Sequence, residues 1–200
     1  MANLCGNTVV MAGNPEKLAR LETIIRKLGA GGKYILPEGI CEELNIDVSK
    51  KGHSYDTAMG RLDDIDFSTI PEGYLRFYCC SAWGDIRGIW DAICETLDLN
   101  GFASLSDADG EYWIVNDPGG IWFPEKLVFD SYGEGTFAEL EMDYYNSEEE
   151  LAEKLNKVSG EEKTFAEWQE YLEDNDDEEG VIRVIDREGN QLLPFRKENV

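Results

Sequence analysis

"NTVVMAGNPEKLARLETIIRKLG", residues 7–29, joins a strand pattern to a helix pattern. The first six residues are rich in β-branched side chains, which favours a strand. Asn14 and Pro15 are residue types preferred at the start of a helix, and Gly29 is a typical stop signal. Between them, four aliphatic side chains recur on one helical face: Leu18, Leu21, Ile25 and Leu28. We therefore expect a strand followed directly by an amphipathic helix.

The same order returns later in the chain. The segment YLRFYCC (74–80) predicts a second strand. Apolar residues then recur at helical spacing up to Asn100-Gly101, at Ile86, Ile89, Trp90, Ile93 and Leu97. Residues 30–73 carry weaker signals, with a short helix compatible with LPEGICEELNI (36–46).

The second half begins with turn-separated strand patterns and continues with two helices. The strand candidates are FASLS (102–106), EYWIV (111–115), KLVFDSY (126–132) and TFAELEMDYY (136–145). Ser147 with Glu150, and Thr164 with Glu167, have the spacing of a capping box, in which each side chain accepts from the other's free backbone N–H. VIRVID (181–186) and QLLPF (191–195) predict a final hairpin.

This order of elements predicts an α+β protein. We expect residues 1–146 to form a ferredoxin-like antiparallel sheet with helices on one face, in which the first two strands pair in parallel. We expect residues 147–200 to form an acidic helical extension with a terminal hairpin, packed on the first domain.

The net charge of −24 is extreme for 200 residues. Residues 101–200 hold 27 acidic and 8 basic side chains, and residues 139–179 hold 17 acidic and 3 basic ones. Charge of this density repels nucleic acid and anionic membranes, so we expect neither as a direct partner. A basic protein remains a candidate partner. No apolar run approaches the ~20 residues of a membrane helix, and no secretion signal is visible, so we expect a protein of the host-cell cytoplasm.

The residue types used in catalysis and metal binding form no recognisable motif. The five cysteines lack a disulfide-framework spacing, and the adjacent Cys79 and Cys80 point to opposite faces of a strand, so we expect free thiols. His53 is the one histidine and lies in a polar segment. The acidic runs at 107–111 and 174–180 lack the glycine and glutamate positions of a calcium-binding EF-hand. We expect no catalytic residue, no cofactor and no metal.

The two acidic helices suggest a binding surface. Their apolar stripes leave carboxylates on the opposite faces. The candidate partner-binding residues are Glu149, Glu153, Glu167, Glu170, Asp174, Asp176, Asp177, Glu178 and Glu179. A plainer reading is a solvated face that serves only solubility, balanced in part by Glu150–Lys154 and Glu153–Lys157 pairs. Both readings remain open.

The N-terminal residues add a family resemblance. MANLCGNTVVMAGNPEKL (1–18) resembles the opening of the YubB-type ferredoxin-like family carried by phages and plasmids, which begins Met-x-Asn-Trp-Cys-x-Asn before an apolar strand, Gly and Asp/Asn-Pro-Glu. The matching residues are Asn3, Cys5, Asn7, Gly13, Pro15 and Glu16, while Leu4 replaces the usual Trp. The good match covers the first 30 or so residues, and looser similarity reaches about residue 145. The resemblance implies a ferredoxin-like fold and a mobile-element origin. It provides no catalytic residues that could be assigned to positions in this sequence.

Taken together, the residues predict a non-enzymatic phage- or plasmid-encoded interaction protein. Its acidic half would mimic nucleic-acid charge and inhibit a basic host protein that binds nucleic acid, such as a defence protein. The alternatives are an accessory protein whose acidity serves only solubility, and a carboxylate-based hydrolase. The hydrolase would place its acids in a cleft beside the aromatic residues Tyr112, Trp113, Trp122 and Phe123.

Overall fold

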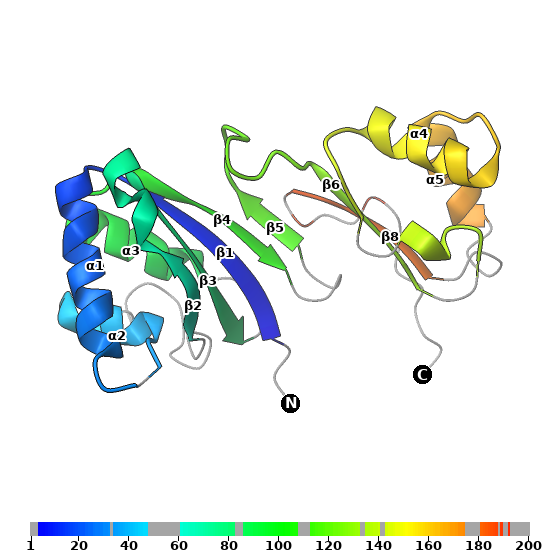
Figure 1. Ribbon diagram of the computed structural model, residues 1–200. Coiled ribbons are helices and arrows are strands. Elements are labelled where there is room, and N and C mark those ends of the chain that lie inside the picture. Colours follow the sequence, from blue (N-terminus) through cyan, green and yellow to red (C-terminus); the bar gives the residue numbers. More distant parts are fainter. Residues whose placement is uncertain are drawn as a thin grey trace. The chain divides into compact units, whose positions relative to one another are not determined.

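The strand and helix expected at residues 7–29 both form in the computed structural model (Figure 1). β1 spans Leu4–Ala12 and α1 spans Pro15–Gly29. Asn14 is the N-cap of α1, and its side-chain oxygen accepts a hydrogen bond of 2.8 Å from the Glu16 amide. The structure describes residues 4–32, 34–47, 61–82, 86–107, 113–132, 135–140, 143–174, 181–187, 189 and 192.

β1 is the central strand of a five-stranded sheet in which every neighbouring pair is antiparallel. The strand order is β2-β3-β1-β4-β5. The other strands are β2 (Leu62–Asp66), β3 (Tyr74–Ala82), β4 (Gly101–Asp107) and β5 (Trp113–Asn116). The chain is therefore α+β with an antiparallel sheet, as the order of its elements predicted.

The expected parallel pairing of the first two predicted strands is wrong. The strand predicted at 74–80 is β3, and it pairs with β1 in antiparallel register, with Val9 opposite Phe77. The reason is β2, which lies within the weakly patterned 30–73 segment and runs parallel to β1. β3 turns back from β2 and enters the sheet between β2 and β1.

Helices cover one face of this sheet (Figure 1). α2 spans Pro37–Glu43, α3 spans Arg87–Leu97, and a 3₁₀ helix spans Phe67–Glu72. α1, α2 and α3 bury their apolar residues in one cluster with inward-facing strand residues such as Val9 and Phe77. Trp90 on α3 packs edge-on against Phe77, with ring centroids 5.3 Å apart, and is a core residue as expected.

A buried polar group joins the three central strands. The Asn7 amide nitrogen on β1 donates to the Ser81 hydroxyl on β3 at 2.8 Å, and its oxygen accepts from the Ser106 hydroxyl on β4 at 2.8 Å. Gly13 is closely packed against Leu99. A Cβ added to this glycine would lie only 2.7 Å from the Leu99 side chain. Two residues that carry the family resemblance, Asn7 and Gly13, therefore have structural roles.

The chain divides into two compact units between Phe123 and Pro124. The expected boundary at residue 146 thus lies inside the second unit. The segment before it belongs with the acidic helices, because β6 contributes Leu127 and Phe129 to the core that these helices cover.

The second unit contains a three-stranded antiparallel sheet of order β7-β6-β8. The strands are β6 (Leu127–Tyr132), β7 (Asp143–Tyr145) and β8 (Val181–Asp186). α4 (Glu148–Ser159) and α5 (Phe165–Asp174) pack on one face of it, with Leu151, Leu155 and Trp168 buried (Figure 1).

Two segments of this unit differ from the strands that the sequence predicted, or show only part of them. The long strand expected over 136–145 is instead a 3₁₀ helix at Ala138–Leu140 followed by the short β7. The terminal hairpin is seen in part: β8 forms and pairs with β6, and the Leu192 amide donates to the Val184 carbonyl at 2.7 Å. The rest of its expected second strand, residues 191 and 193–195, lies outside the described residues.

Candidate functional site

The first acidic helix begins with a modified version of the expected capping box. The Ser147 hydroxyl accepts from the Glu150 amide at 3.1 Å, as predicted. The Glu150 carboxylate reaches one residue further back than predicted, and it accepts from the backbone and side-chain nitrogens of Asn146 at 2.7 and 3.0 Å. Glu150 is thus occupied at the helix start, and the expected Glu150–Lys154 pair is replaced by a 3.9 Å contact of Lys154 with Asp143.

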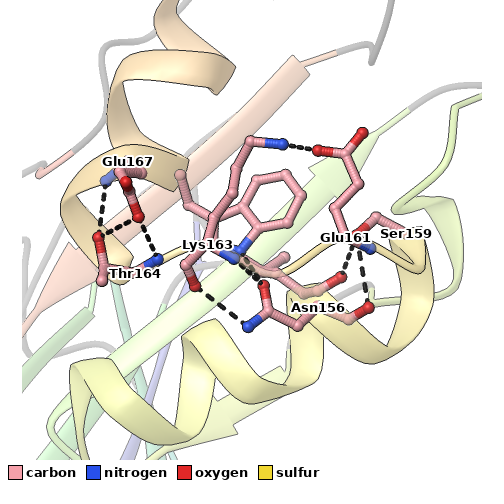
Figure 2. Close-up of polar contacts among 8 residues, drawn as sticks. Asn156, Ser159, Glu161, Lys163, Thr164 and Glu167 are labelled. Carbon is pink, nitrogen blue, oxygen red and sulfur yellow. Dashed lines mark hydrogen bonds and ion pairs between the residues drawn. The ribbon is translucent and has the colours of Figure 1, made fainter.

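The second acidic helix begins with the reciprocal capping box that its sequence predicted. The Glu167 carboxylate accepts from both the Thr164 amide and the Thr164 hydroxyl at 2.8 Å. The Thr164 hydroxyl in turn accepts from the Glu167 amide at 3.3 Å. Figure 2 shows Thr164 and Glu167 facing each other at this end of α5. Glu167 therefore fixes the helix end as well as contributing charge.

Asn156 holds the corner between α4 and α5 (Figure 2). Its side-chain oxygen accepts from the Trp168 indole N–H at 2.7 Å and from the Lys163 amide at 3.0 Å. Its side-chain nitrogen donates to the Lys163 carbonyl at 3.1 Å. One amide thus satisfies two backbone groups of the connecting segment and the indole of a buried tryptophan. Buried or half-buried polar groups require such partners, so Asn156 gives this corner a defined geometry.

Lys163 is the basic residue of this corner, and neighbouring side chains hold its charge. Its ammonium group forms an ion pair with Glu161. It also lies 4.5 Å from the centre of the Trp168 ring and 4.7 Å from the centre of the Tyr171 ring, which is cation–π geometry. A lysine held against its own protein in this way offsets little of the charge that the other carboxylates present to solvent.

Five of the nine predicted partner-binding residues fall within the described part of the chain, and all five are exposed. Three of them, Glu167, Glu170 and Asp174, line one shallow groove along α5. Glu149 instead borders a second hollow, at the start of α4, where Lys126 lies nearby, and Glu153 borders neither. The remaining four, Asp176, Asp177, Glu178 and Glu179, lie outside the described residues.

Sequence reasoning missed two acids of the α5 groove. Glu161 and Glu162 line it together with Lys163 and Tyr171. They lie in the turn after Gly160, which ends α4 with a φ of 77°. A search restricted to the faces of helices passes over such residues. The run "GEEK" between two predicted helices was the available signal.

Hydrogen bonds lower the pKa of two of the acids. Bonds from the Thr164 amide and hydroxyl lower the pKa of Glu167. Bonds from its own backbone N–H and from the Ser147 hydroxyl lower the pKa of Glu149. Donors that favour the carboxylate over the carboxylic acid cause both shifts.

The cap at Glu167 predicts a pH-dependent contribution to stability. Because folding lowers its pKa, the capping carboxylate stabilises the fold above its unfolded value of about 4.3, and this stabilisation disappears as pH falls through the lower folded value. We expect the stability difference between the wild type and Glu167→Gln to be constant near neutral pH and to shrink in acid. Urea unfolding of both proteins between about pH 3 and 7 measures it. Glu170→Gln is the control, since Glu170 has no hydrogen bond or ion pair with the described residues. An equal pH trend at both positions would contradict this assignment.

The cysteines are free thiols, and four of the five are buried. Burial raises the pKa of Cys41 to about 11 and that of Cys94 to about 12, so these thiols stay protonated and unreactive near neutral pH. Within the described ranges, no group of three or more His, Cys, Asp or Glu side chains could hold a metal ion. His53 lies outside those ranges.

The aromatic residues proposed to line a hydrolase cleft are only partly visible. Tyr112 and the side chain of Trp113 lie outside the described part of the chain. Phe123 is buried in a small cluster with Val10, whereas Trp122 is 38% exposed.

None of the helices formed by the described residues is long and apolar enough to span a membrane.

No family model, curated protein or solved structure matches the chain. The corner itself is the most distinctive feature of the second unit: a fixed turn and helix present exposed carboxylates around one groove.

Proposed function

We propose that this chain is a non-enzymatic, phage- or plasmid-encoded inhibitor that binds a basic host protein by imitating the charge of nucleic acid. One observation carries the proposal: Glu161, Glu162, Glu167, Glu170 and Asp174 line a single groove, and the one lysine there is already paired. A nucleic-acid-binding protein recognises the negative charges of a phosphate backbone, and this groove gathers five carboxylates.

The fixed geometry of the groove favours binding over simple solubility. Charge that only keeps a protein dispersed needs no particular arrangement. Here Asn156 fixes the connection between the helices, and Thr164 and Glu167 fix the start of α5. Carboxylates held by a rigid frame lose less conformational entropy when a partner binds.

Glu149 and Glu167 have the pKa shift of fixed negative charges and not of a proton donor. A hydrolase of the carboxylate type needs one acid with a raised pKa to donate a proton. Hydrogen bonds lower the pKa of both Glu149 and Glu167. This shift favours carboxylates that act as fixed negative charges.

For the first unit we propose a ferredoxin-like domain of the YubB type. The strand order supports this, since β3 lies between β1 and β2, and β1 lies between β3 and β4, as in two interleaved βαβ units. The residues of the N-terminal resemblance support the same fold through the roles of Asn7 and Gly13 in packing. A mobile-element origin rests on that resemblance.

Competition with nucleic acid tests the function. The tagged full-length chain is used to capture proteins from host lysate at low and at high salt, and the captured protein is then offered DNA or RNA. We expect capture that weakens steeply with salt, because occupying a nucleic-acid site involves the same ionic contacts. We also expect the nucleic acid to displace the chain. A partner that binds the chain and its nucleic acid simultaneously would show that the mimicry proposal is wrong.

A further inference from the structure

A second surface, on the first unit, has a different chemistry from the acidic groove. The turn after β5 is held by Asp117, whose carboxylate accepts from the amides of Trp122 at 2.7 Å and Phe123 at 2.9 Å. Within the turn, the Gly120 amide donates a hydrogen bond of 3.0 Å to the Asp117 carbonyl. Phe123 is buried beside Val10 and anchors the far end. This turn therefore has a fixed shape.

The fixed turn exposes two large apolar side chains. Ile121 is 76% exposed and Trp122 is 38% exposed. The Trp122 ring lies against Tyr74 of β3, with centroids 4.8 Å apart and the rings tilted by 54°. We call Tyr74, Ile121 and Trp122 the apolar tip. Exposing an isoleucine and a tryptophan side by side is unfavourable in water, and rigid tryptophans of this kind commonly dominate protein–protein binding energy.

Two acidic side chains lie beside Tyr74, at one edge of the apolar tip. The Tyr74 hydroxyl donates to the Glu72 carboxylate at 2.9 Å. Asp66 also acts electrostatically on Tyr74, and the nearby Arg76 interacts with Asp66. Two carboxylates and one guanidinium leave this edge of the tip acidic, on a chain whose net charge is −24.

We propose that the apolar tip inserts into an apolar pocket, bordered by lysine or arginine, on a partner protein. Charge complementarity selects this occupant. A second copy of the chain would bring two acidic edges together, and an anionic lipid surface would be repelled in the same way. The tip supplies the buried anchor, and Glu72 and Asp66 face the basic border. This surface is separate from the groove on α5 and does not depend on the function proposed for it.

Site-specific cross-linking tests the proposal in the full chain. The photoreactive residue p-benzoylphenylalanine replaces Ile121 in one protein and the exposed Tyr144 of β7 in a control. We expect a protein that cross-links from position 121 and not from position 144. The cross-linked peptide of that partner protein should lie in an apolar pocket of the partner, with lysine or arginine around the pocket. No specific cross-link, or a cross-link to a second copy or to lipid, would overturn the proposal.

Affinity measurements with the purified cross-linking protein complete the test. We expect Ile121→Ser and Trp122→Ala each to weaken binding at least about tenfold, and Tyr144→Ser to leave it unchanged. The losses should persist at high salt, since they arise from apolar contact. Ile121 is largely exposed, so the unfolding midpoint of Ile121→Ser should match that of the wild type, whereas Trp122→Ala should lower it slightly because the ring packs against Tyr74. Unchanged affinity in both tip variants would refute the assignment.

Discussion

Replacing Asn156 with alanine is expected to destabilise the second unit by about 3 kcal/mol. The substitution removes three hydrogen bonds and leaves the Trp168 indole N–H, the Lys163 amide and the Lys163 carbonyl without their partner. Trp168 is almost fully buried, so its indole has little access to replacement water. Urea unfolding of the full chain measures the loss, and hydrogen exchange should localise it to α4 and α5.

Two further variants make this result specific. Asn156→Asp keeps an acceptor for the indole but cannot donate to the Lys163 carbonyl, so we expect an intermediate loss. Asn146→Ala is the matched control, because its side chain contacts Glu150 at an exposed position. We expect it to cost less than about 1 kcal/mol. Equal losses at positions 146 and 156 would show that the corner is not held as described.

Neutralising the groove is expected to weaken capture of the host partner by about 100-fold at low salt. The variant carries Glu161→Gln, Glu162→Gln, Glu170→Gln and Asp174→Asn. Four exposed ion pairs at about 0.7 kcal/mol each amount to roughly 3 kcal/mol, which corresponds to this factor. Glu167 is left in place because its carboxylate caps α5, and its removal would mix loss of charge with loss of structure.

A charge-matched variant is the control for this experiment. It carries Glu16→Gln, Glu42→Gln, Asp91→Asn and Glu95→Gln, four exposed positions on the helices of the first unit. Both variants lose four negative charges, so general electrostatic attraction falls equally in both. We expect the control to retain most of its affinity. If both variants weaken capture to the same extent, net charge alone explains the binding and the groove has no special role.

The sequence predicted the parts of this fold that depend on neighbouring residues. The cap at Asn14, the apolar stripe of α1 and the reciprocal bonds between Thr164 and Glu167 each involve groups within one or two helical turns. Local spacing is enough to recognise such features.

The parts that the sequence did not predict depend on contacts between distant segments. Asn156 acts on Trp168, twelve positions away, and no periodic pattern connects the two. β2 was missed because its sequence, LDDID, has three aspartates where a half-buried strand usually alternates polar with apolar residues. Without β2, the direction of β3 relative to β1 was assigned incorrectly.

The acidity that concealed β2 has a consequence for how copies of this protein meet. β2 is at the edge of the sheet formed by the described strands, and its register with β3 shifts between Asp63 and Asp66. An open edge is a template on which another chain can add a strand, the first step toward amyloid-like polymers. Aspartates and an irregular register oppose that addition, because an incoming strand would meet repelling charges and a broken ladder of hydrogen bonds. The five-stranded sheet thus carries its own protection against polymerisation at this edge.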